Sequence, residues 1–473
     1  MDNVTRKRKA LTVRPLKTSQ TAGAVLAFQG MAKAMPLLHG SQGCSAFTKV
    51  AFVRHFREPI AIQTTAMDQT STIMGAEDNL VEAMATLAAK SGAELLGVVT
   101  TGLSDTQGCD LQRAIFRFRE SYPQWREWPV VPVHAPDFTG SMESGFALAV
   151  TAMVEHLAPA RPWQGEKQPR INVLTNASLT PGDLETLDEL LCAFGLEAAF
   201  LPNLADSLDG HLAEGEFSPI TRGGTPLTFF AEYHTACATL VIGSSMAVAA
   251  QRLQLRCPMP LLSFDHLMGL DATDKLVVEL CRLTEKSPPR QVDRWRRQMQ
   301  DAMLDCHYTL GEKRVALAGE VDMVAGFHQL LEEIGARTVA AVVPDCKAPL
   351  GNLHLTVGDL DDMESLAVQK QAEWMIGNSQ LAETSERLSL PLLRAGFPVF
   401  DRLGGFRQVR IGYKGGRDTL FEMANLLLPR QSHGVAPYVG TLRPLLETLG
   451  GKNDDPNMES MARSPQSSQR QHG

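Results

Sequence analysis

The sequence predicts an α/β protein built from three Rossmann-like domains with mainly parallel sheets. Short buried apolar segments, such as residues 95–101, alternate with segments of helical periodicity, such as residues 77–90. This alternation is typical of a parallel sheet covered by helices. The chain has 473 residues, 44% of them hydrophobic and 21% charged. A globular chain of this length divides into about three domains, because one hydrophobic core does not grow so large.

We place the domain boundaries where the composition changes. The expected parts are a basic, solvated N-terminal tail (1–13), a first α/β domain (14–160), a second (170–305), a third (310–445) and a disordered tail (450–473). The linker between the first two domains, at 159–167, is polar and contains prolines. The final segment is rich in Ser, Gln, Asn and Asp, so it has little apolar surface to bury.

Each domain has its own run of expected elements. In the first domain we expect strands at 60–65, 95–101 and 130–133 and helices at 77–90 and 146–154. In the second we expect strands at 171–174, 239–243 and 260–264, and a helix with Thr180 as N-cap and Pro181 as first residue. A charged helix at 288–304 leads to the third, with strands at 314–319, 338–343 and 374–377 and a helix at 418–428.

The most informative local pattern is His-Gly-Ser-Gln-Gly-Cys at residues 39–44. Gly40 and Gly43 carry no Cβ, so the backbone can approach closely whatever the sulfur of Cys44 contacts. The residues from 45 onward are predicted to form the first turns of a helix. Backbone N–H groups and the dipole at a helix N-terminus favour a thiolate, which is the form that ligates iron. Cys44 is therefore a candidate ligand.

The remaining cysteines form no recognisable ligand set. The chain has eight cysteines, and none stands in a CxxC or CxC pair. A self-contained zinc site or disulfide framework is therefore not expected. Most lie in apolar surroundings, which is typical of small buried side chains in a protein from a reducing compartment.

Several classes of protein are excluded by the absence of their patterns. The net charge of −8 leaves no basic excess for nucleic-acid binding. No secretory signal or membrane-spanning stretch is present, so we expect a cytoplasmic protein with no membrane partner. Neither GxGxxG after a strand, nor GxxxxGK[ST], nor GxSxG occurs. The glycine pairs at 404–405 and 415–416 are interpreted as turns, and histidines such as His39 and His55 as hydrogen-bonded polar residues.

Several motifs together resemble the β-type subunits of the nitrogenase molybdenum–iron protein family. They are Pro-Leu-Lys-Thr-Ser-Gln at 15–20, Gly-Ala-Val-Leu at 23–26, Met-Pro-Leu-Leu at 35–38, the run at 39–44 and Arg-His-Phe-Arg-Glu-Pro at 54–59. The resemblance extends from about residue 14 to residue 428. It implies the nitrogenase component 1 type of fold.

Within that family, the number of cysteines distinguishes catalytic subunits from assembly scaffolds. The catalytic β-subunit resembled here has three cluster-ligating cysteines, at positions that correspond to Ser19, Cys44 and Gly102 of this chain. Two of the three thiolates are therefore missing, and the P-cluster of the catalytic subunit could not be held. The segments 63–68 and 401–405 also resemble the scaffold subunits. The resemblance thus implies a cofactor-assembly scaffold with no catalytic residues.

The resemblance also implies cofactors and partners. Cys44 would give one ligand to a [4Fe–4S] cluster, and the scaffold subunit NifE would give three in an α2β2 complex. The complex would hold a transient precursor of the iron–molybdenum cofactor, to which molybdenum and homocitrate are added. Other expected partners are the nitrogenase iron protein, apo-nitrogenase and cofactor-delivery proteins. Cys109, seven residues after Gly102, is a weaker candidate ligand, because a helix is expected to separate it from the strand end.

Two alternatives remain. The chain could be a redox-enzyme subunit, either the nitrogenase β-subunit or a subunit of the dark-operative protochlorophyllide reductase. The missing cysteines argue against the first, and the His-Phe-Arg-Glu and His-Gly-Ser-Gln-Gly-Cys contexts argue against the second. The other alternative is an interaction protein without metal. It would require Cys44 to be an ordinary packed thiol, and its polar, glycine-rich surroundings argue against that.

Overall fold

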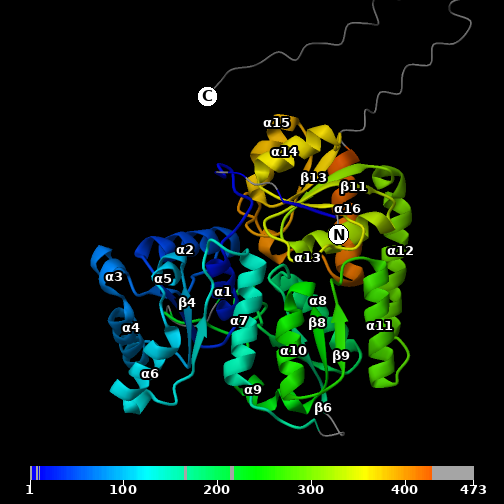
Figure 1. Cartoon of the computed structure of the whole chain (residues 1–473). Coiled ribbons are helices and arrows are strands. Elements are labelled where there is room, and N and C mark those ends of the chain that lie inside the picture. Colours follow the sequence, from blue (N-terminus) through cyan, green and yellow to red (C-terminus); the bar gives the residue numbers. More distant parts are fainter. Residues whose placement is uncertain (1–2, 7–8, 10, 164–167, 213–217, 429–473) are drawn as a thin grey trace, which may run out of the picture. The chain divides into compact units, whose positions relative to one another are not determined.

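The computed structural model describes residues 3–6, 9, 11–163, 168–212 and 218–428. These residues form three sheets whose named strands all pair in parallel (Figure 1). The α/β fold with mainly parallel sheets is confirmed. Each predicted domain contains one sheet, while the exact domain boundaries stay predictions. The segment 450–473 lies outside the described residues. None of the described helices is long and apolar enough to cross a membrane.

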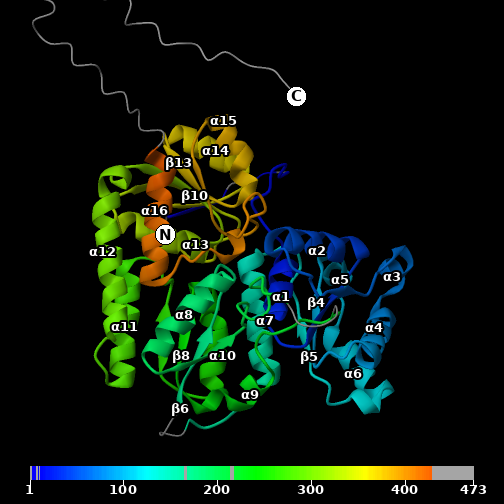
Figure 2. The same ribbon diagram turned by 180° about the vertical axis from the view of Figure 1, so that it is seen from behind.

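The first sheet has the strand order β3-β2-β4-β5. Its strands are β2 (Ala34–His39), β3 (Gln63–Thr64), β4 (Leu95–Thr100) and β5 (Val130–Val133). Its helices are α1 (Gln20–Gln29), α2 (Gln42–Phe56), α3 (Gln69–Met74), α4 (Glu77–Lys90), α5 (Gly102–Thr106), α6 (Leu111–Ser121) and α7 (Met142–Leu157). Figure 2 shows α4 and α6 on one side of β4, and α1 and α7 on the other. Both faces are covered, so β2 and β4 are buried along their whole length.

The second sheet has the order β7-β6-β8-β9. It comprises β6 (Gln168–Leu174), β7 (Glu197–Leu201), β8 (Ala236–Ile242) and β9 (Leu261–Phe264), with helices α8 (Pro181–Ala193), α9 (Thr228–Glu232), α10 (Ala247–Arg256) and α11 (Leu270–Thr284). The predicted cap of α8 is confirmed. The hydroxyl of Thr180 accepts a hydrogen bond from the backbone N–H of Asp183, at 3.0 Å, and Pro181 is the first helical residue.

The third sheet has the order β1-β12-β11-β10-β13-β14. Its strands are β1 (Val4–Arg6), β10 (Arg314–Ala318), β11 (Arg337–Val343), β12 (Leu355–Val357), β13 (Trp374–Gly377) and β14 (Leu392–Arg394). The associated helices are α12 (Arg290–Leu310), α13 (Val321–Glu333), α14 (Leu360–Gln369), α15 (Ala382–Leu388) and α16 (Gly412–Leu427).

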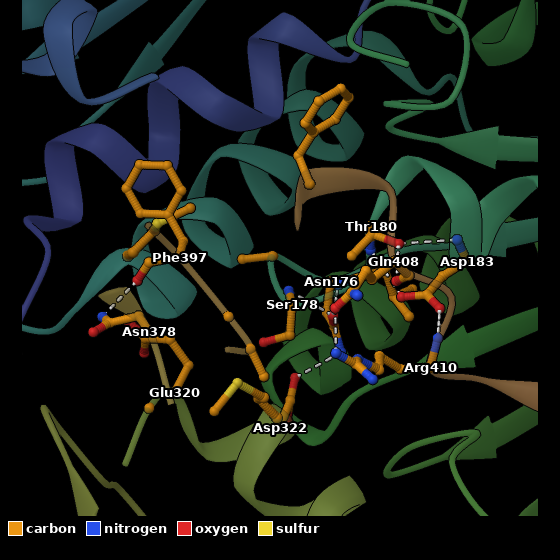
Figure 3. A pocket seen from close by; sticks show the side chains of 18 of the residues that line it. Asn176, Ser178, Thr180, Asp183, Glu320, Asp322, Asn378, Phe397, Gln408 and Arg410 are labelled. Carbon is orange, nitrogen blue, oxygen red and sulfur yellow. Dashed lines mark hydrogen bonds between the residues drawn. The ribbon is translucent and has the colours of Figure 1, made fainter. Parts of the chain in front are cut away.

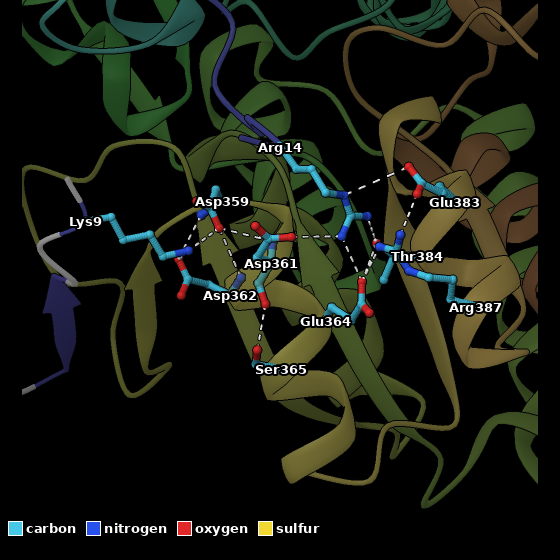
Figure 4. Close-up of polar contacts among 10 residues, drawn as sticks. All are labelled: Lys9, Arg14, Asp359, Asp361, Asp362, Glu364, Ser365, Glu383, Thr384 and Arg387. Atoms are coloured by element: carbon cyan, nitrogen blue, oxygen red, sulfur yellow. Dashed lines mark hydrogen bonds and ion pairs between the residues drawn. The ribbon is translucent and has the colours of Figure 1, made fainter. Parts of the chain in front are cut away.

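The N-terminal segment is not the solvated tail that the sequence predicts. Its residues 4–6 form the edge strand β1, which pairs in parallel with β12. The ammonium of Lys9 lies 2.5 Å from Asp359 and 2.9 Å from Asp362, and the guanidinium of Arg14 lies 3.0 Å from Asp361 (Figure 4). The reason is electrostatic. Aspartates at the start of α14 stabilise the positive end of the helix dipole. Lys9 and Arg14 in turn neutralise the negative charge of these aspartates.

The glycines at 415 and 416 also differ from the prediction, because they lie inside α16 and not in a turn. A Cβ on Gly416 would lie 2.6 Å from Cε of Met299 in α12, and one on Gly415 would lie 2.7 Å from the carbonyl carbon of Arg410. Close packing of α16 against its neighbours therefore leaves no room for side chains at these two positions.

A second close contact between backbones joins α1 to α7. A Cβ on Gly23 would lie 1.8 Å from the carbonyl oxygen of Met142, and one on Gly145 would lie 1.8 Å from the carbonyl oxygen of Gln20. The start of α1 is therefore fixed against the start of α7 by two glycines from segments far apart in the sequence. Because Ser19 directly precedes α1, this contact also fixes the position of Ser19.

Gly145→Ala should destabilise the protein, although the same change in an open helix stabilises by about 1 kcal/mol. The added methyl would overlap a backbone oxygen that cannot rotate away, and overpacking of this kind costs about 1–3 kcal/mol. Thermal unfolding followed by circular dichroism should show a lower Tm. Gly43→Ala is the control, because a Cβ there has no neighbour closer than 3.9 Å. Equal Tm values for the two variants would contradict the close contact.

Candidate functional site

The candidate site lies at the carboxyl edge of the first sheet. The parallel strands β2 and β4 end together, with His39 opposite Thr100. The chain leaves β2 through Gly40 into α2, and leaves β4 through Thr101 into α5. A Cβ on Gly40 would lie 2.5 Å from Oγ1 of Thr101, and that hydroxyl donates a hydrogen bond to the carbonyl of His39 at 3.1 Å. The glycine at position 40 is thus required by the close approach of the two strand ends.

Cys44 is the third residue of α2, so the expectation that it stands at a helix N-terminus is confirmed. The helix begins at Gln42, a few residues earlier than the sequence predicts. The Cys44 side chain is half-buried, and its sulfur lies 3.5 Å from the hydroxyl oxygen of Ser41. A Cβ on Gly43 would meet nothing closer than 3.9 Å. No bulky side chain therefore stands beside position 43, and the neighbouring thiol is partly exposed to a ligand. Its role as an iron ligand stays a prediction.

The other two positions at which the resembled subunit has cysteines are arranged differently. Ser19 is the N-cap of α1, and its hydroxyl accepts a hydrogen bond from the N–H of Ala22 at 3.1 Å. A Cβ on Gly102 would lie 2.1 Å from Oδ1 of Asp137. Ser19 and Asp137 border the same cavity. A capping hydroxyl and a carboxylate therefore stand where two sulfurs would be.

Asp137 was missed by the sequence reasoning. It lies in the loop after β5, more than thirty residues beyond Gly102, and no motif marks it. Only the parallel pairing of β4 with β5 brings its carboxylate beside the start of α5. In a single sequence, the sole available signal is that an acidic residue follows a buried strand.

Cys109 does not lie with Cys44. It follows α5, as expected, and is half-buried against the apolar cluster between the sheet and α4 and α6. Burial raises the pKa of the Cys109 thiol to about 11, and the carboxylates of Asp105 and Asp110 raise it further. The environment thus keeps Cys109 protonated, whereas metal ligation requires the thiolate.

The two histidines near α2 have different environments. His55 accepts a hydrogen bond from the N–H of Val399 through Nδ1, at 2.9 Å, so its expected pairing is confirmed. His39 is only partly satisfied. Its Nδ1 lies 3.0 Å from the hydroxyl of Thr65, but its buried Nε2 has no hydrogen-bond partner among the residues that the structure describes. Burial lowers the pKa of each imidazole to about 4, so both are neutral near pH 7.

The residues present fit one cluster ligand and not a complete set. Among the residues that the structure describes, no group of three or more His, Cys, Asp or Glu side chains is placed to hold a metal ion. Cys44 supplies a partly exposed thiol in the first turn of a fifteen-residue helix, whose N-terminal N–H groups favour a negatively charged ligand. Such a site could accept the corner of a cluster whose other irons are bound by a second protein.

A second polar region surrounds a cavity of about 90 Å³ between elements of all three sheets (Figure 3). Its polar walls bond to one another. Asp183 accepts hydrogen bonds from the N–H groups of Arg410, at 2.6 Å, and Ile411, at 3.1 Å. Asp322 accepts one from the amide of Asn176 at 3.1 Å. These hydrogen bonds satisfy part of the polar lining of the cavity.

Three carboxyl groups cluster beside this cavity, and two of them, those of Glu143 and Asp322, are buried. Burial raises the pKa of Glu143 well above its ordinary value, and the nearby Asp322 raises it further. Burial also raises the pKa of Glu320 to about 7, partly opposed by the hydroxyl of Ser141, which donates to it at 2.6 Å. The backbone N–H of Asp322 donates to Glu143 at 2.8 Å. Hydrogen bonds and partial protonation thus stabilise this cluster at the meeting of α7 and α13.

Comparison with known proteins identifies the class. The family described as nitrogenase component 1 type oxidoreductase matches residues 19–428, and the chain belongs to this family. Its structure resembles one chain of "Nitrogenase Cp1 at pH 6.5", with a TM-score of 0.83 and 27% identity, over 90% of this chain and 95% of that one. A chain of "Nitrogenase Cp1 at pH 5" shares the fold, with a TM-score of 0.67 and 14% identity.

Within that family, the chain is similar to the nitrogenase iron–molybdenum cofactor biosynthesis protein NifN from several organisms. It is 41% identical to NifN of Klebsiella pneumoniae, over 94% of this chain and 96% of that protein. It is also 41% identical to NifN of a Nostoc species, over 92% of this chain and 97% of that protein. The NifN of Bradyrhizobium diazoefficiens is 38% identical, over 92% of this chain and 93% of that protein.

The environment of Cys109 predicts slow alkylation. With a pKa of about 11, about one Cys109 thiol in a thousand is ionised at pH 8, so iodoacetamide should modify it far more slowly than the exposed Cys192. Its rate should rise about tenfold for each pH unit until the pH approaches this pKa. Peptide mass spectrometry after timed quenching measures both rates. Equal rates for Cys109 and Cys192 in the folded protein would contradict the burial described here.

Proposed function

We propose that this chain is a scaffold subunit in the biosynthesis of the nitrogenase iron–molybdenum cofactor, and not an enzyme. The observation that carries the proposal is the site at the carboxyl edge of the first sheet. It has one half-buried cysteine in the first turn of α2, while Ser19 and Gly102 stand at the two other ligand positions of the resembled catalytic subunit. The similarity to proteins named NifN supports the same function.

The cluster in this proposal is shared between two subunits. A [4Fe–4S] cluster commonly takes four thiolates. Cys44 supplies one, so three come from the partner subunit NifE, in an α2β2 complex. The cluster supplies electron transfer when bound. The role of this chain is to hold one iron through Cys44, to leave space at Gly43, and to direct the N–H groups of α2 toward an anionic group.

An exposed apolar surface next to Cys44 supports a shared site. Phe47 is 80% exposed and Val50 56% exposed on α2, and Ile73 and Met74 of α3 are each 81% exposed. The N–H of Met67, just before α3, donates to the carbonyl of Gly40 at 2.9 Å, so α3 starts beside the turn that carries Cys44. Large apolar side chains gathered on a surface favour protein–protein contact. We assign this surface, Phe47, Val50, Ile73 and Met74, to the partner subunit.

The cofactor precursor, with its added molybdenum and homocitrate, is held transiently and chiefly by the partner subunit in this proposal. The central cavity of this chain supports that division in part, because the carboxylates of Asp183 and Asp322 in its walls already accept hydrogen bonds from this chain. The nitrogenase iron protein, apo-nitrogenase and cofactor-delivery proteins are the proposed transient partners. A cytoplasmic location is consistent with the eight cysteines, which all lie in the described part of the chain and form no disulfide there.

A second candidate is a subunit of a redox enzyme, of the nitrogenase or protochlorophyllide-reductase type. The observation that favours it is the TM-score of 0.83 to a chain of nitrogenase Cp1. The two candidates differ in the cluster that they require. A catalytic β-subunit needs thiolates at all three positions, whereas the scaffold needs Cys44 alone. Measuring the iron content and cluster type of the purified complex therefore separates them.

Cys44→Ala should alter or remove the shared cluster. After anaerobic co-purification with the partner subunit, the variant should contain less iron than the parent, or show a changed EPR signal if another group replaces the thiolate. Cys192→Ala is the matched control, because Cys192 is exposed on a different domain. An unaltered cluster in Cys44→Ala would refute the ligand assignment. A stoichiometric cluster in this chain purified alone would refute the shared site.

Phe47→Asp should weaken assembly with the partner subunit. It places a charge at the centre of the proposed contact surface, where desolvation without a partner is unfavourable. Size-exclusion chromatography of the co-expressed subunits should show free chain in place of complex. Phe116→Asp is the control, since Phe116 is 64% exposed on α6, away from Cys44. Loss of assembly in both variants, or in neither, would contradict the assigned surface.

A further inference from the structure

Ser41 occupies the N-cap position of α2 but does not cap the helix. Its backbone has the extended conformation of an N-cap, with φ −74° and ψ 159°, yet its side chain makes no hydrogen bond to the N–H groups of the first turn. The N-caps Ser19 and Thr180 do make such bonds, at 3.1 and 3.0 Å. A serine at this position ordinarily accepts a hydrogen bond from the second or third residue of the helix. The hydroxyl of Ser41 is therefore turned to another partner.

That partner is the sulfur of Cys44. The hydroxyl oxygen lies 3.5 Å from Sγ, and both residues are half-buried. With a neutral thiol, either atom can donate. A thiolate has no proton and can only accept, so ligation of iron by Cys44 leaves one direction for this hydrogen bond, from the Ser41 O–H to the sulfur.

A hydrogen bond of this kind has a definite electrostatic effect. Reduction adds negative charge to an iron–sulfur cluster and its thiolates. A donor aimed at a ligating sulfur stabilises the reduced form more than the oxidised form, and hydrogen bonds to the sulfurs are one of the factors that set cluster potentials. The hydroxyl of Ser41 would therefore raise the reduction potential.

We infer that Ser41 is a positioning residue of the shared cluster, which donates a hydrogen bond to the Cys44 thiolate and raises the reduction potential of the cluster. This inference rests on the proposed function, because it requires Cys44 to be a ligand. The hydroxyl reaches the sulfur directly, at 3.5 Å, within the first turn of α2.

The test compares Ser41→Ala, Ser41→Gly and Ser41→Thr in the complex with the partner subunit. Alanine and glycine remove the hydroxyl, and glycine is also a tolerated N-cap residue, so it separates loss of the donor from loss of helix stability. Threonine restores a hydroxyl. The midpoint potential is read from the EPR signal of the reduced cluster during an anaerobic redox titration, with iron content and Tm measured on the same samples.

The expected result is a midpoint shifted to more negative potential in the alanine and glycine variants, and a midpoint close to the parent's in the threonine variant. At the parent's midpoint, less than half of the cluster should be reduced in the first two. Because the EPR signal comes only from loaded molecules, partial loss of iron does not prevent the measurement. Thr180→Ala, which removes a true cap on α8, should lower the Tm and leave the midpoint unchanged.

Unchanged midpoints in both the alanine and the glycine variants would overturn the inference, as would an equal shift in the threonine variant. The Cys44→Ala measurement separates this failure from failure of the proposed function. If Cys44→Ala changes the cluster while the Ser41 variants do not change its midpoint, only the role of Ser41 is wrong. If Cys44→Ala leaves the cluster unaltered, the ligand assignment is wrong as well.

Discussion

The parallel pairing of β2 with β4 is the constraint on which the candidate site depends. Because His39 lies opposite Thr100, both strands end at the same level and both lead directly into helices. The two strand ends approach so closely that position 40 has no room for a side chain. The pairing therefore fixes the backbone that carries Cys44. It also places the Cys44 sulfur in the first turn of α2, at the positive end of the helix dipole.

The helix that carries Cys44 is also fixed at its other end. At 2.9 Å, Nδ1 of His55 accepts the N–H of Val399, and the ring of Phe397 lies 4.8 Å from that of His55. The guanidinium of Arg54 lies 4.0 Å over the ring of Phe400. The Arg-His-Phe-Arg motif that contributes to the family resemblance thus attaches α2 to a loop of the third sheet. The position of Cys44 depends on this contact, although the contact is three helical turns away from it.

The N-terminal segment connects the first and third sheets through a second set of contacts. It begins as an edge strand of the third sheet, is held by Lys9 and Arg14 at the start of α14, and ends at Ser19, where α1 begins. Leu16, buried at 3% exposure, packs into the core of the third sheet. Residues 4–6 and Lys9 precede the predicted first domain, and Arg14 and Leu16 stand at its start, yet all of them contact elements of the third sheet.

The sequence was informative where local chemistry determines structure. Buried apolar runs such as that of β4 predict strands, and the Thr180–Pro181 pair predicts the start of α8, because strand burial and helix capping depend on neighbouring residues. The sequence-based prediction failed where contacts between distant segments determine the structure. Gly415 and Gly416 have low helix propensity, yet both lie in α16, where Gly415 packs against the backbone of Arg410 and Gly416 against Met299 of α12. The strand β1 is too short and too basic for an apolar pattern, and its partner β12 is about 350 residues away in the sequence.

The same distinction between local and distant contacts explains which parts of the candidate site the sequence predicts. The glycines, Cys44 and the helix start all lie within a few residues, so a local pattern predicts them. The carboxylate of Asp137 and the orientation of Ser41 depend on the folded arrangement.

A single thiol cannot hold a cluster, so in the proposed complex each iron–thiolate bond to Cys44 is also a bond between subunits. Binding of the cluster and association of the subunits are then thermodynamically linked: whatever stabilises one stabilises the other. Such coupling suits a scaffold, because loss of the cluster would also weaken the association of the subunits.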